Sequence, residues 1–415
     1  MKEKYIVCID LKSFFASCEC LERNIDPFTT PLVVCNPYRN DSITLAVTPY
    51  LKQFGVSGRT RVYNLPKNIN IKKVPPRMSL YIKKSKEVVE TYLEFVSPND
   101  IHIYSIDEVF LDVTDYLKLY KTDVYSLTLK ILNRIKEKDG LTATAGIGPN
   151  MLLAKVSMDI EAKHTKDNIA HWTYKDVETK LWKITPLSKM WGIGSRMEKN
   201  LNKLGVFTIG DLAQYNKYLL KEKFGVIGEE LWNHANGIDD STIADYKKEP
   251  KDKSYSHSQI LYKDYDDKNV TLIIKEMSKV LAQRLRENKK HTSLISLHIS
   301  YSKSVGGGFS HMNKLETSTD NEQIIESTCL NIFDKFYEDL PIRKVGISVG
   351  KLSDNNSIQL NLFESFKEIK EENNMNKAID EISNKFGKNS IIPASALLND
   401  STLIERNKKI GGHNA

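Results

Sequence analysis

The chain has 415 residues, of which 40% are hydrophobic and 27% are charged, a composition that is typical of a globular protein and excludes a largely disordered chain. One hydrophobic core does not normally extend over so many residues, so the length predicts roughly two to four domains. The net charge of +7 permits a nucleic acid partner, but it is small enough to occur on an ordinary solvated surface.

The N-terminal residues and the five cysteines bear on the compartment. The stretch MKEKYIVCIDLKSFF has too short an apolar run for a signal peptide, and no window approaches the roughly 20 apolar residues of a membrane span. The odd number of cysteines and their lack of metal-binding spacing favour reduced thiols, with Cys18 and Cys20 open as metal ligands. We therefore expect a cytoplasmic protein without a membrane contact.

The first region alternates apolar strands with amphipathic helices, which predicts a mixed α/β layer. A buried strand over residues 5–11 carries Asp10 near its end, and a helix over residues 13–24 follows at once. Short apolar strands broken by proline between residues 26 and 78 indicate a small insertion. Beyond it we expect a helix at 79–96, a bent strand or strand pair at 101–113, a helix at 121–138, a strand at 141–148 and a helix at 150–163.

Two further regions and a tail complete the chain. The region that starts near Thr173 is predicted to contain two helices joined by the Gly-Ile-Gly of residues 192–194. Residues 245–353 have the predicted order strand, helix, strand, strand, helix, strand, which is a compact βαββαβ unit. The stretch 245–316 holds 14 basic and 9 acidic residues, so much of the positive excess can lie there. Residues 364–415 are polar, and we expect a tail with one helix.

Three acids stand in an apolar setting. Asp10 lies near the end of one core strand, and Asp107 and Glu108 are adjacent in the apolar stretch YSIDEVFLDV. Buried carboxylates are costly unless they are paired or bind a cation, and three of them together suit two Mg²⁺ ions about 4 Å apart, as in phosphoryl transfer. A regular strand would point Asp107 and Glu108 to opposite sides, so we expect a bend at residues 105–108 that turns both toward one cleft. A hairpin tip with two solvated acids is the alternative.

Four stretches of the chain resemble successive motifs of the Y-family translesion DNA polymerases, nearest to the bacterial UmuC and UvrX-like branch: CIDLKSFFASCE, YSIDEVFLDVTD, TATAGIGPNMLLAKVSMDIEAK and WGIGSRMEKNLNKLGVFTIGDL. The resemblance runs in order from about residue 5 to residue 353. It implies an α+β multidomain protein with the right-hand polymerase architecture. In chain order, its parts would be the first part of the palm at 1–25, the fingers at 26–78, the second part of the palm at 79–172, a helical thumb with a helix-hairpin-helix at 173–240, a βαββαβ little finger at 245–353 and a tail with a clamp-binding peptide at 354–415.

The resemblance also implies a catalytic centre. Asp10, Asp107 and Glu108 match the metal-binding acids of the family, and the main-chain carbonyl of Leu11 matches its backbone ligand. These residues would hold two Mg²⁺ ions.

Contacts to the incoming nucleotide are implied in the same way. Phe15 matches the steric gate of the family, a ring that leaves no room for a 2′-hydroxyl group, whereas the alternative is a core ring like its neighbour Phe14. Lys52 and Lys163 fall where the family places basic residues on the triphosphate. Both matches are imperfect, because Pro49 stands where the family usually has tyrosine and Lys163 requires a one-residue insertion in its helix. The hydroxyl group that helps to hold the triphosphate is therefore not assigned.

Glycine-rich stretches are candidates for contacts with DNA. Gly192 and Gly194 resemble the turn of a helix-hairpin-helix, in which backbone N–H groups approach a DNA phosphate without reading sequence. The same tripeptide at residues 146–148 is expected to be a strand-to-helix turn. The glycine run at 306–308 would pass close to a phosphate or form a flexible hairpin or bulge.

The stretch SIQLNLFES at residues 357–365 resembles the bacterial sliding-clamp-binding peptide. Gln359 would fix its register, and Leu360, Leu362 and Phe363 supply its apolar residues. The alternative is a final strand segment at the edge of a core.

We therefore expect a monomeric DNA polymerase that adds dNTPs to a primer on damaged or undamaged template DNA, in damage tolerance of the SOS type, with the bacterial sliding clamp as a partner. A non-catalytic factor that binds DNA and the clamp would require loss of a carboxylate, whereas all three are present. A nucleotidyl cyclase with a related palm would lack the thumb and the clamp peptide.

Overall fold

The computed structural model describes residues 4–250, 252–354 and 366–414. The chain divides into two compact units, Met1–Glu249 with His413–Ala415 and Pro250–Gly412, and each is described by itself. No helix in these described ranges is long and apolar enough to cross a membrane. The predicted clamp-binding residues lie outside the described residues: Gln359, Leu360, Leu362 and Phe363.

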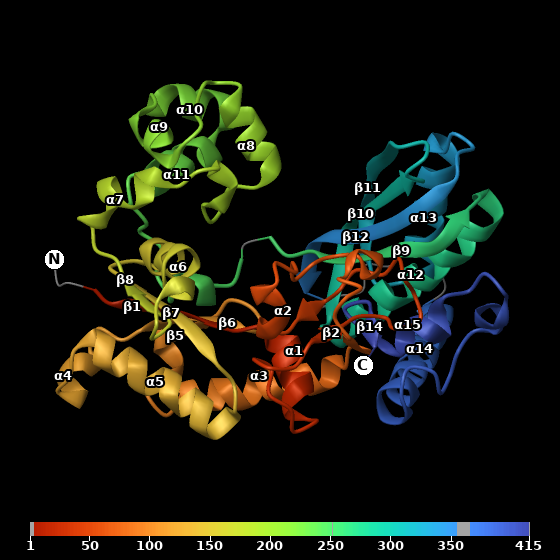
Figure 1. Cartoon of the computed structure of the whole chain (residues 1–415). Coiled ribbons are helices and arrows are strands. Elements are labelled where there is room, and N and C mark those ends of the chain that lie inside the picture. The colour runs from red at the N-terminus through yellow and green to blue at the C-terminus, as the bar shows by residue number, and fades with distance from the viewer. Residues whose placement is uncertain (1–3, 251, 355–365, 415) are drawn as a thin grey trace. The chain divides into compact units, whose positions relative to one another are not determined.

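A five-stranded sheet is the centre of the first unit (Figure 1). Its strands lie in the order β5 (Ile101–Ile103), β6 (Glu108–Asp112), β1 (Ile6–Leu11), β7 (Ala143–Gly148) and β8 (Ile169–His171). Helices α3 (Met78–Tyr92) and α5 (Val124–Asp139) cover one face, and α6 (Met151–Ile160) covers the other. The predicted mixed α/β layer is confirmed.

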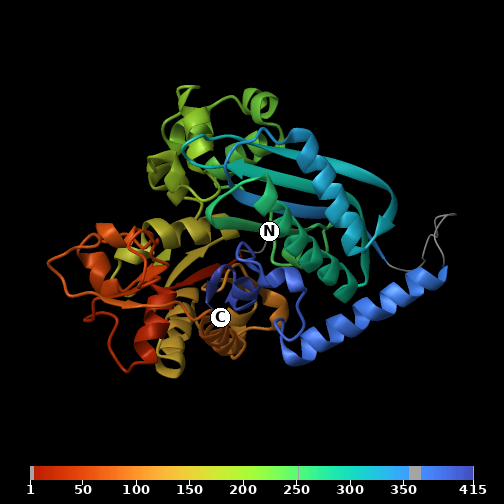
Figure 2. The same cartoon turned by 90° about the vertical axis from the view of Figure 1, so that its right-hand side faces the viewer.

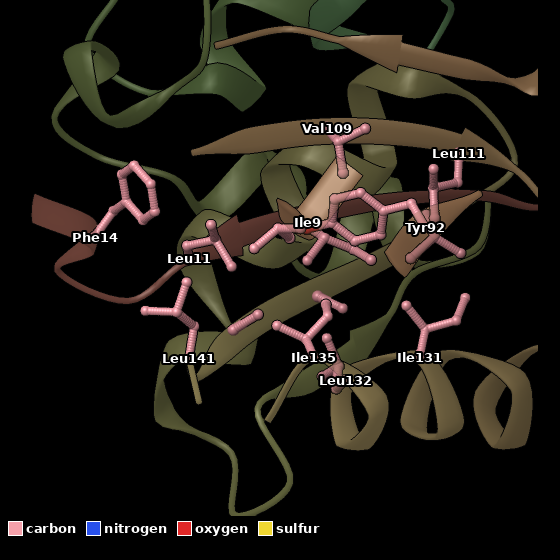
Figure 3. Packing of buried hydrophobic residues seen from close by; sticks show 14 of the residues in the cluster. Ile9, Leu11, Phe14, Tyr92, Val109, Leu111, Ile131, Leu132, Ile135 and Leu141 are labelled. Carbon is pink, nitrogen blue, oxygen red and sulfur yellow. The ribbon is translucent and has the colours of Figure 1, made fainter. Parts of the chain in front are cut away.

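Strand β1 contributes to two cores, because successive side chains of a strand point to opposite faces. Ile9 and Leu11 pack with side chains of β6, α3 and α5 in the larger core (Figure 3). Ile6 and Cys8 pack with β6 and α6 on the other face. Asp10 follows the same alternation as Cys8, so it lies on the α6 side of the sheet.

The contact between β7 and α6 leaves no room for a side chain. A Cβ atom on Gly146 would lie 2.1 Å from the carbonyl oxygen of Ala154, and one on Gly148 would lie 2.4 Å from the backbone nitrogen of the same residue. Glycine is therefore required at both positions by backbone packing. Our interpretation of residues 146–148 as a strand-to-helix turn is wrong, because these residues are inside β7 and the turn begins at Pro149.

The small insertion predicted at residues 26–78 follows α1 (Phe14–Leu21). It contains a three-stranded sheet in the order β3-β2-β4 and has a small core of its own. Its elements are β2 (Leu32–Val34), β3 (Ala46–Val47), α2 (Pro49–Gln53), the 3-10 turn η1 (Val62–Asn64) and β4 (Lys72–Val74). Two short elements elsewhere in the first unit are η2 (Pro98–Asp100) and α4 (Tyr116–Tyr120).

A helical region follows β8, and its core includes Leu152, Leu153 and Val156 of α6. Its elements are α7 (Asp176–Thr179), η4 (Leu181–Lys183), η5 (Leu187–Lys189), α8 (Ser195–Asn202), α9 (Ile209–Gln214), α10 (Lys217–Phe224) and α11 (Val226–Ala235). We expected residues 192–194 to join two helices, but they join the three-residue η5 to α8. Between Pro186 and Gly192 the chain forms the 3-10 turn η5 and not an α-helix. Helices α8 and α9 both follow residues 192–194 and are joined through Gly205, whose φ is +79°.

The second unit has the predicted βαββαβ order. Its elements are β9 (Tyr255–Tyr265), α12 (Asp267–Glu287), β10 (Lys290–Tyr301), β11 (Gly308–Thr319), α13 (Glu322–Phe336) and β12 (Ile342–Asp354). The strands lie in the order β11-β10-β12-β9, and the apolar side chains of one sheet face pack with both helices.

The C-terminal residues hold one long helix, as expected, but they are more than a tail. The elements are α14 (Phe366–Phe386), seen as a long blue helix in Figure 2, η7 (Ala394–Leu397), α15 (Leu403–Asn407), β13 (Lys409–Ile410) and β14 (His413–Asn414). Arg286 of α12 donates hydrogen bonds of 2.7 and 3.0 Å to Asp380. The buried carboxylate of Glu276 accepts hydrogen bonds from Ser401 and Thr402. These polar residues bind to the folded unit, which a reading of composition alone did not predict.

Candidate active site

Asp107 and Glu108 lie at the tip of the hairpin formed by β5 and β6. The chain bends at residues 105–107, and the N–H of Leu11 donates a 2.9 Å hydrogen bond to the carbonyl oxygen of Asp107. The bend is where the sequence predicted it. The alternative of a hairpin tip is also correct in outline, but the side chain of Glu108 is only 10% exposed, so the two acids are not both solvated.

Asp10 lies directly opposite Glu108 in the pairing of β1 with β6, so the two side chains leave the same face of the sheet. Burial raises the pKa of Asp10 to about 6, and the charges of Asp107 and Glu108 add to this rise while Lys163 opposes it. The structure therefore brings the three predicted acids close enough to repel one another.

Lys155 of α6 neutralises part of this charge. Its Nζ lies 2.9 Å from Oε1 of Glu108 and 2.9 Å from Oδ2 of Asp159, and Cys8 donates a 3.2 Å hydrogen bond to the same Oε1 of Glu108. Burial alone would lower the pKa of Lys155, but Asp159 and Glu108 outweigh this effect and raise it. Our sequence analysis missed Lys155 and Asp159, although their spacing of four residues on a predicted helix was a signal for such a pair.

The carboxylates fit a hard divalent cation by their chemistry. Among the residues that the structure describes, no group of three or more His, Cys, Asp or Glu side chains is arranged to hold a metal ion, and Glu108 is turned toward Lys155. An all-oxygen set from Asp10, Asp107 and Glu108 is nevertheless what Mg²⁺ prefers. A cation would offset both the burial and the repulsion that raise the pKa of Asp10.

Three lysines gather near Asp10. Lys163, in the 3-10 turn η3 (Ala162–His164), lies 3.8 Å from Oδ2 of Asp10 and 2.8 Å from Oδ1 of Asp159. Desolvation lowers the pKa of Lys52 in α2; Asp10 opposes this shift and Lys163 adds to it. Desolvation and the charge of Lys52 likewise lower the pKa of Lys12, which the sequence analysis did not single out. Such mutually repelling ammonium groups suit a polyanionic ligand.

The two adjacent phenylalanines have different surroundings. Phe14 is 2% exposed and belongs to the larger core. Phe15 is only partly buried, and its ring centroid lies 4.8 Å from that of Tyr81. Phe14 is thus a packing residue, whereas Phe15 presents part of its ring on the outside of the core.

The glycines of residues 192–194 face open space. Gly192 has a φ of +89°, which favours glycine, and a Cβ atom on Gly192 or Gly194 would meet no atom within 4 Å. Gly194 is the N-cap residue of α8. In the second unit, by contrast, a Cβ on Gly308 would lie 2.2 Å from the carbonyl oxygen of Ile299, so this glycine is required by the hairpin of β10 and β11.

The middle of the open face of the second unit's sheet carries mostly small, polar and basic side chains. Its residues follow from the strand pairing and the alternation of side chains. They are Ser256, Ser258 and Ile260 of β9, Leu294, Ser296, His298 and Ser300 of β10, Gly308, Ser310, Met312 and Lys314 of β11, and Lys344, Gly346, Ser348 and Gly350 of β12. Small, polar and basic side chains on one face suit contacts with a phosphate backbone.

The raised pKa of Asp10 predicts that ionising this residue lowers the free energy of unfolding of the metal-free protein. The folded state favours protonated Asp10, because its pKa rises from 3.8 to about 6 on folding. This preference stabilises the folded state fully below pH 3.8, and the stabilisation is lost as the pH rises through about 6. In EDTA at pH 8, Asp10→Asn should therefore increase the free energy of unfolding by at most about 3 kcal/mol, and by less at pH 5. Urea unfolding at both pH values measures this difference, and a variant no more stable than the wild type at pH 8 would contradict it.

Three family models match the chain. The model described as the impB/mucB/samB family matches residues 9–159, the C-terminal domain of that family matches residues 252–362, and the IMS family HHH motif matches residues 174–206.

Curated relatives match over almost the whole chain. The "Putative UV-damage repair protein UvrX" of Bacillus subtilis (strain 168) is 39% identical over 99% of this chain and 97% of its own length. The "DNA polymerase IV 2" of the same strain is 34% identical over 100% of this chain and 99% of its own. Among solved structures, the "Y-family DNA polymerase chimera Dbh-Dpo4(243-245)-Dbh" has a TM-score of 0.67 and 20% identity, covering 85% of this chain and 100% of that one, which shows a shared fold.

Proposed function

This chain belongs to the impB/mucB/samB family of Y-family DNA polymerases, and from that premise we propose that it extends a primer on damaged or undamaged DNA by two-metal phosphoryl transfer. It is a DNA-directed DNA polymerase. The observation that supports the chemistry best is the convergence of three carboxylates at the adjoining ends of β1 and β6, with lysines beside them.

Each residue of this site has a role in the proposed reaction. Asp10, Asp107, Glu108 and the carbonyl oxygen of Leu11 would hold two Mg²⁺ ions. Bound there, the ions would stabilise the charge that develops when the primer 3′-hydroxyl attacks the α-phosphorus of the dNTP and pyrophosphate leaves.

The remaining residues of the site would position the nucleotide. Lys52 and Lys163 would bind the triphosphate, because their ammonium groups repel each other until an anion lies between them. Phe15 would lie against the sugar, held from behind by Tyr81.

The domains follow from the same proposal. The sheet of the first unit would be the palm, and the insertion at 26–78 would be the fingers. The helical region at 173–240 would be the thumb, with Gly192 and Gly194 near a DNA phosphate, and the sheet at 245–353 would be the little finger. The small, polar and basic side chains in the middle of that sheet's open face support a contact with the DNA backbone.

Primer extension tests the proposal. The purified protein with Mg²⁺, dNTPs and a primer-template should extend the primer on an undamaged template and past at least one lesion of a panel. Extension should stop when EDTA is added. No incorporation on any template, with intact binding of DNA, would favour the non-catalytic alternative.

We also propose that residues 359–363 bind the bacterial sliding clamp, because a polymerase that grips DNA by backbone charge alone dissociates after few additions, and tethering raises its local concentration. Replacing Leu362 and Phe363 together by alanine should weaken clamp binding by about tenfold or more, which is at least ~1.4 kcal/mol. Extension tracts should shorten only when the clamp is loaded on DNA.

Two outcomes would contradict the clamp proposal. Equal clamp affinity of the double variant and the wild type in a titration would remove residues 359–363 from the account. Reduced extension of a bare primer-template would instead place Leu362 and Phe363 in the folded polymerase.

We propose in addition a role in damage tolerance of the SOS type, which the name of a relative in UV-damage repair supports.

A further inference from the structure

Six aromatic side chains of the first unit form one cluster that links four separate stretches of the chain. The hairpin of β5 and β6, with Tyr104 in its connection, contributes three rings. The residue before the Gly-Ile-Gly contributes one, and α11 and the 3-10 turn η6 (Asp245–Lys247) contribute one each. The members of this Trp191 cluster are His102, Tyr104, Phe110, Trp191, His234 and Tyr246.

Trp191 is the member that joins the helical region to the central sheet. Its Nε1 donates a 3.2 Å hydrogen bond to the hydroxyl oxygen of Tyr104, and the two rings meet edge to face with centroids 6.0 Å apart. On its other side Trp191 stacks almost parallel to His234 of α11, at 6.5 Å. A displacement of Trp191 would therefore change its contact with Tyr104.

Both partners of this hydrogen bond stand next to residues of the proposed function. Trp191 directly precedes Gly192, which is proposed to lie near a DNA phosphate. Tyr104 directly precedes the bend that carries the acids, and its backbone N–H donates a 3.0 Å hydrogen bond to the carbonyl oxygen of Glu108. Two hydrogen bonds thus connect the residue before the glycine turn to Glu108: the side-chain bond from Trp191 to Tyr104 and the backbone bond from Tyr104 to Glu108.

The other end of β5 is held independently. The ring of Tyr246 stacks on His102 with centroids 4.3 Å apart, and Nζ of Lys247 donates a 2.5 Å hydrogen bond to the carbonyl oxygen of Pro98. These contacts hold the chain on the side of Tyr104 that is away from the bend.

Tyr104 is 45% exposed and belongs to none of the described core clusters, so its hydroxyl contributes little to stability. We propose that Trp191 and Tyr104 are positioning residues that couple the seating of the glycine turn on DNA to the placement of Asp107 and Glu108. This inference rests on the proposed function.

A double-mutant cycle tests the coupling. Trp191→Phe removes the indole donor, Tyr104→Phe removes the hydroxyl acceptor, and the double variant removes both. Trp232→Phe is the matched control, because Nε1 of Trp232 donates a 3.0 Å hydrogen bond to the carbonyl oxygen of Tyr215 within the helical region. The readouts are the single-turnover incorporation rate, the dNTP affinity, the primer-template affinity and the thermal midpoint. A second DNA substrate has a duplex too short to reach the glycine turn.

Each single variant should lower the incorporation rate by about threefold or more, and the double variant should lower it no further, because the same hydrogen bond is lost. Primer-template affinity should stay within about twofold, since the phosphate contacts are unchanged. On the short duplex the wild type should slow to the rate of the variants. The control should keep the wild-type rate on both substrates.

Three results overturn the inference while the proposed function stands: rate losses that multiply in the double variant, an equal loss in Trp232→Phe, or variants that change only the thermal midpoint. Failure of the wild type to extend any primer contradicts the proposed function and this inference with it.

Discussion

Removing either acid of the hairpin tip is expected to abolish dNTP incorporation, by at least about a thousandfold, while primer-template affinity changes by less than about threefold. The reason is that Asp107 and Glu108 would hold the cations that stabilise the transferring phosphate, whereas affinity for DNA comes mainly from phosphate contacts elsewhere. Single-turnover incorporation and fluorescence anisotropy with labelled primer-template measure the two quantities for Asp107→Ala and Glu108→Ala.

The choice of substitution matters at Glu108. Its side chain is paired with Lys155 at 2.9 Å, so alanine would leave this largely buried ammonium with Asp159 as its remaining partner and would destabilise the fold as well. Glu108→Gln keeps the shape and a hydrogen-bond acceptor, so it separates loss of charge from loss of folding. Asp112→Asn is the matched control, because Asp112 lies on the same face of β6 and accepts a 3.0 Å hydrogen bond from the N–H of Thr114, which asparagine can also accept. Near-normal extension by Asp107→Ala or Glu108→Gln would refute the site assignment.

Phe15→Ala is expected to raise the efficiency of ribonucleotide relative to deoxyribonucleotide incorporation by at least about tenfold. Loss of the ring opens the space that a 2′-hydroxyl would occupy. The surface behind the ring is fixed, because Tyr81 is fully buried and its hydroxyl donates a 2.7 Å hydrogen bond to Glu19. The cavity left by alanine should therefore stay open. The ratio of kcat/KM for the two nucleotide classes measures the effect.

Phe14→Ala is the counterpart of this substitution in the core. Because Phe14 is 2% exposed, its truncation should cost roughly 3–5 kcal/mol in the free energy of unfolding and leave sugar selectivity unchanged. Urea unfolding of both variants completes the comparison. An exchange of the two phenotypes would show that the rings have been assigned to the wrong roles.

The elements that the sequence predicted best are those whose pattern is local. The βαββαβ order of the second unit follows from strands that alternate and helices with a period near 3.6, and both signals are contained in each segment. The bend before Glu108 was predictable for another reason, since two adjacent acids in an apolar strand cannot both face one cleft on a regular backbone.

The features that were missed depend on what lies opposite in space. The sequence offers Lys155 a partner in Asp159 on the same helix, but its contact with Glu108 at 2.9 Å depends on the pairing of β1 with β6 under α6. Likewise, the glycines at 146–148 and 192–194 have the same local sequence. The first pair is required by a neighbouring helix, whereas the second pair faces open space.

Gly146 and Gly148 of β7 limit the substitutions that this enzyme can accept during evolution. The backbones of β7 and α6 touch without an intervening side chain, so no sequence of small substitutions can raise or lower α6, with Lys155 and Asp159 on it, by a fraction of an ångström. The insertion at 26–78 has its own core of Val, Leu and Cys side chains, which can be altered one methyl group at a time. Selection can therefore change the insertion, which would be the fingers, in small steps, whereas a variant at Gly146 or Gly148 displaces α6.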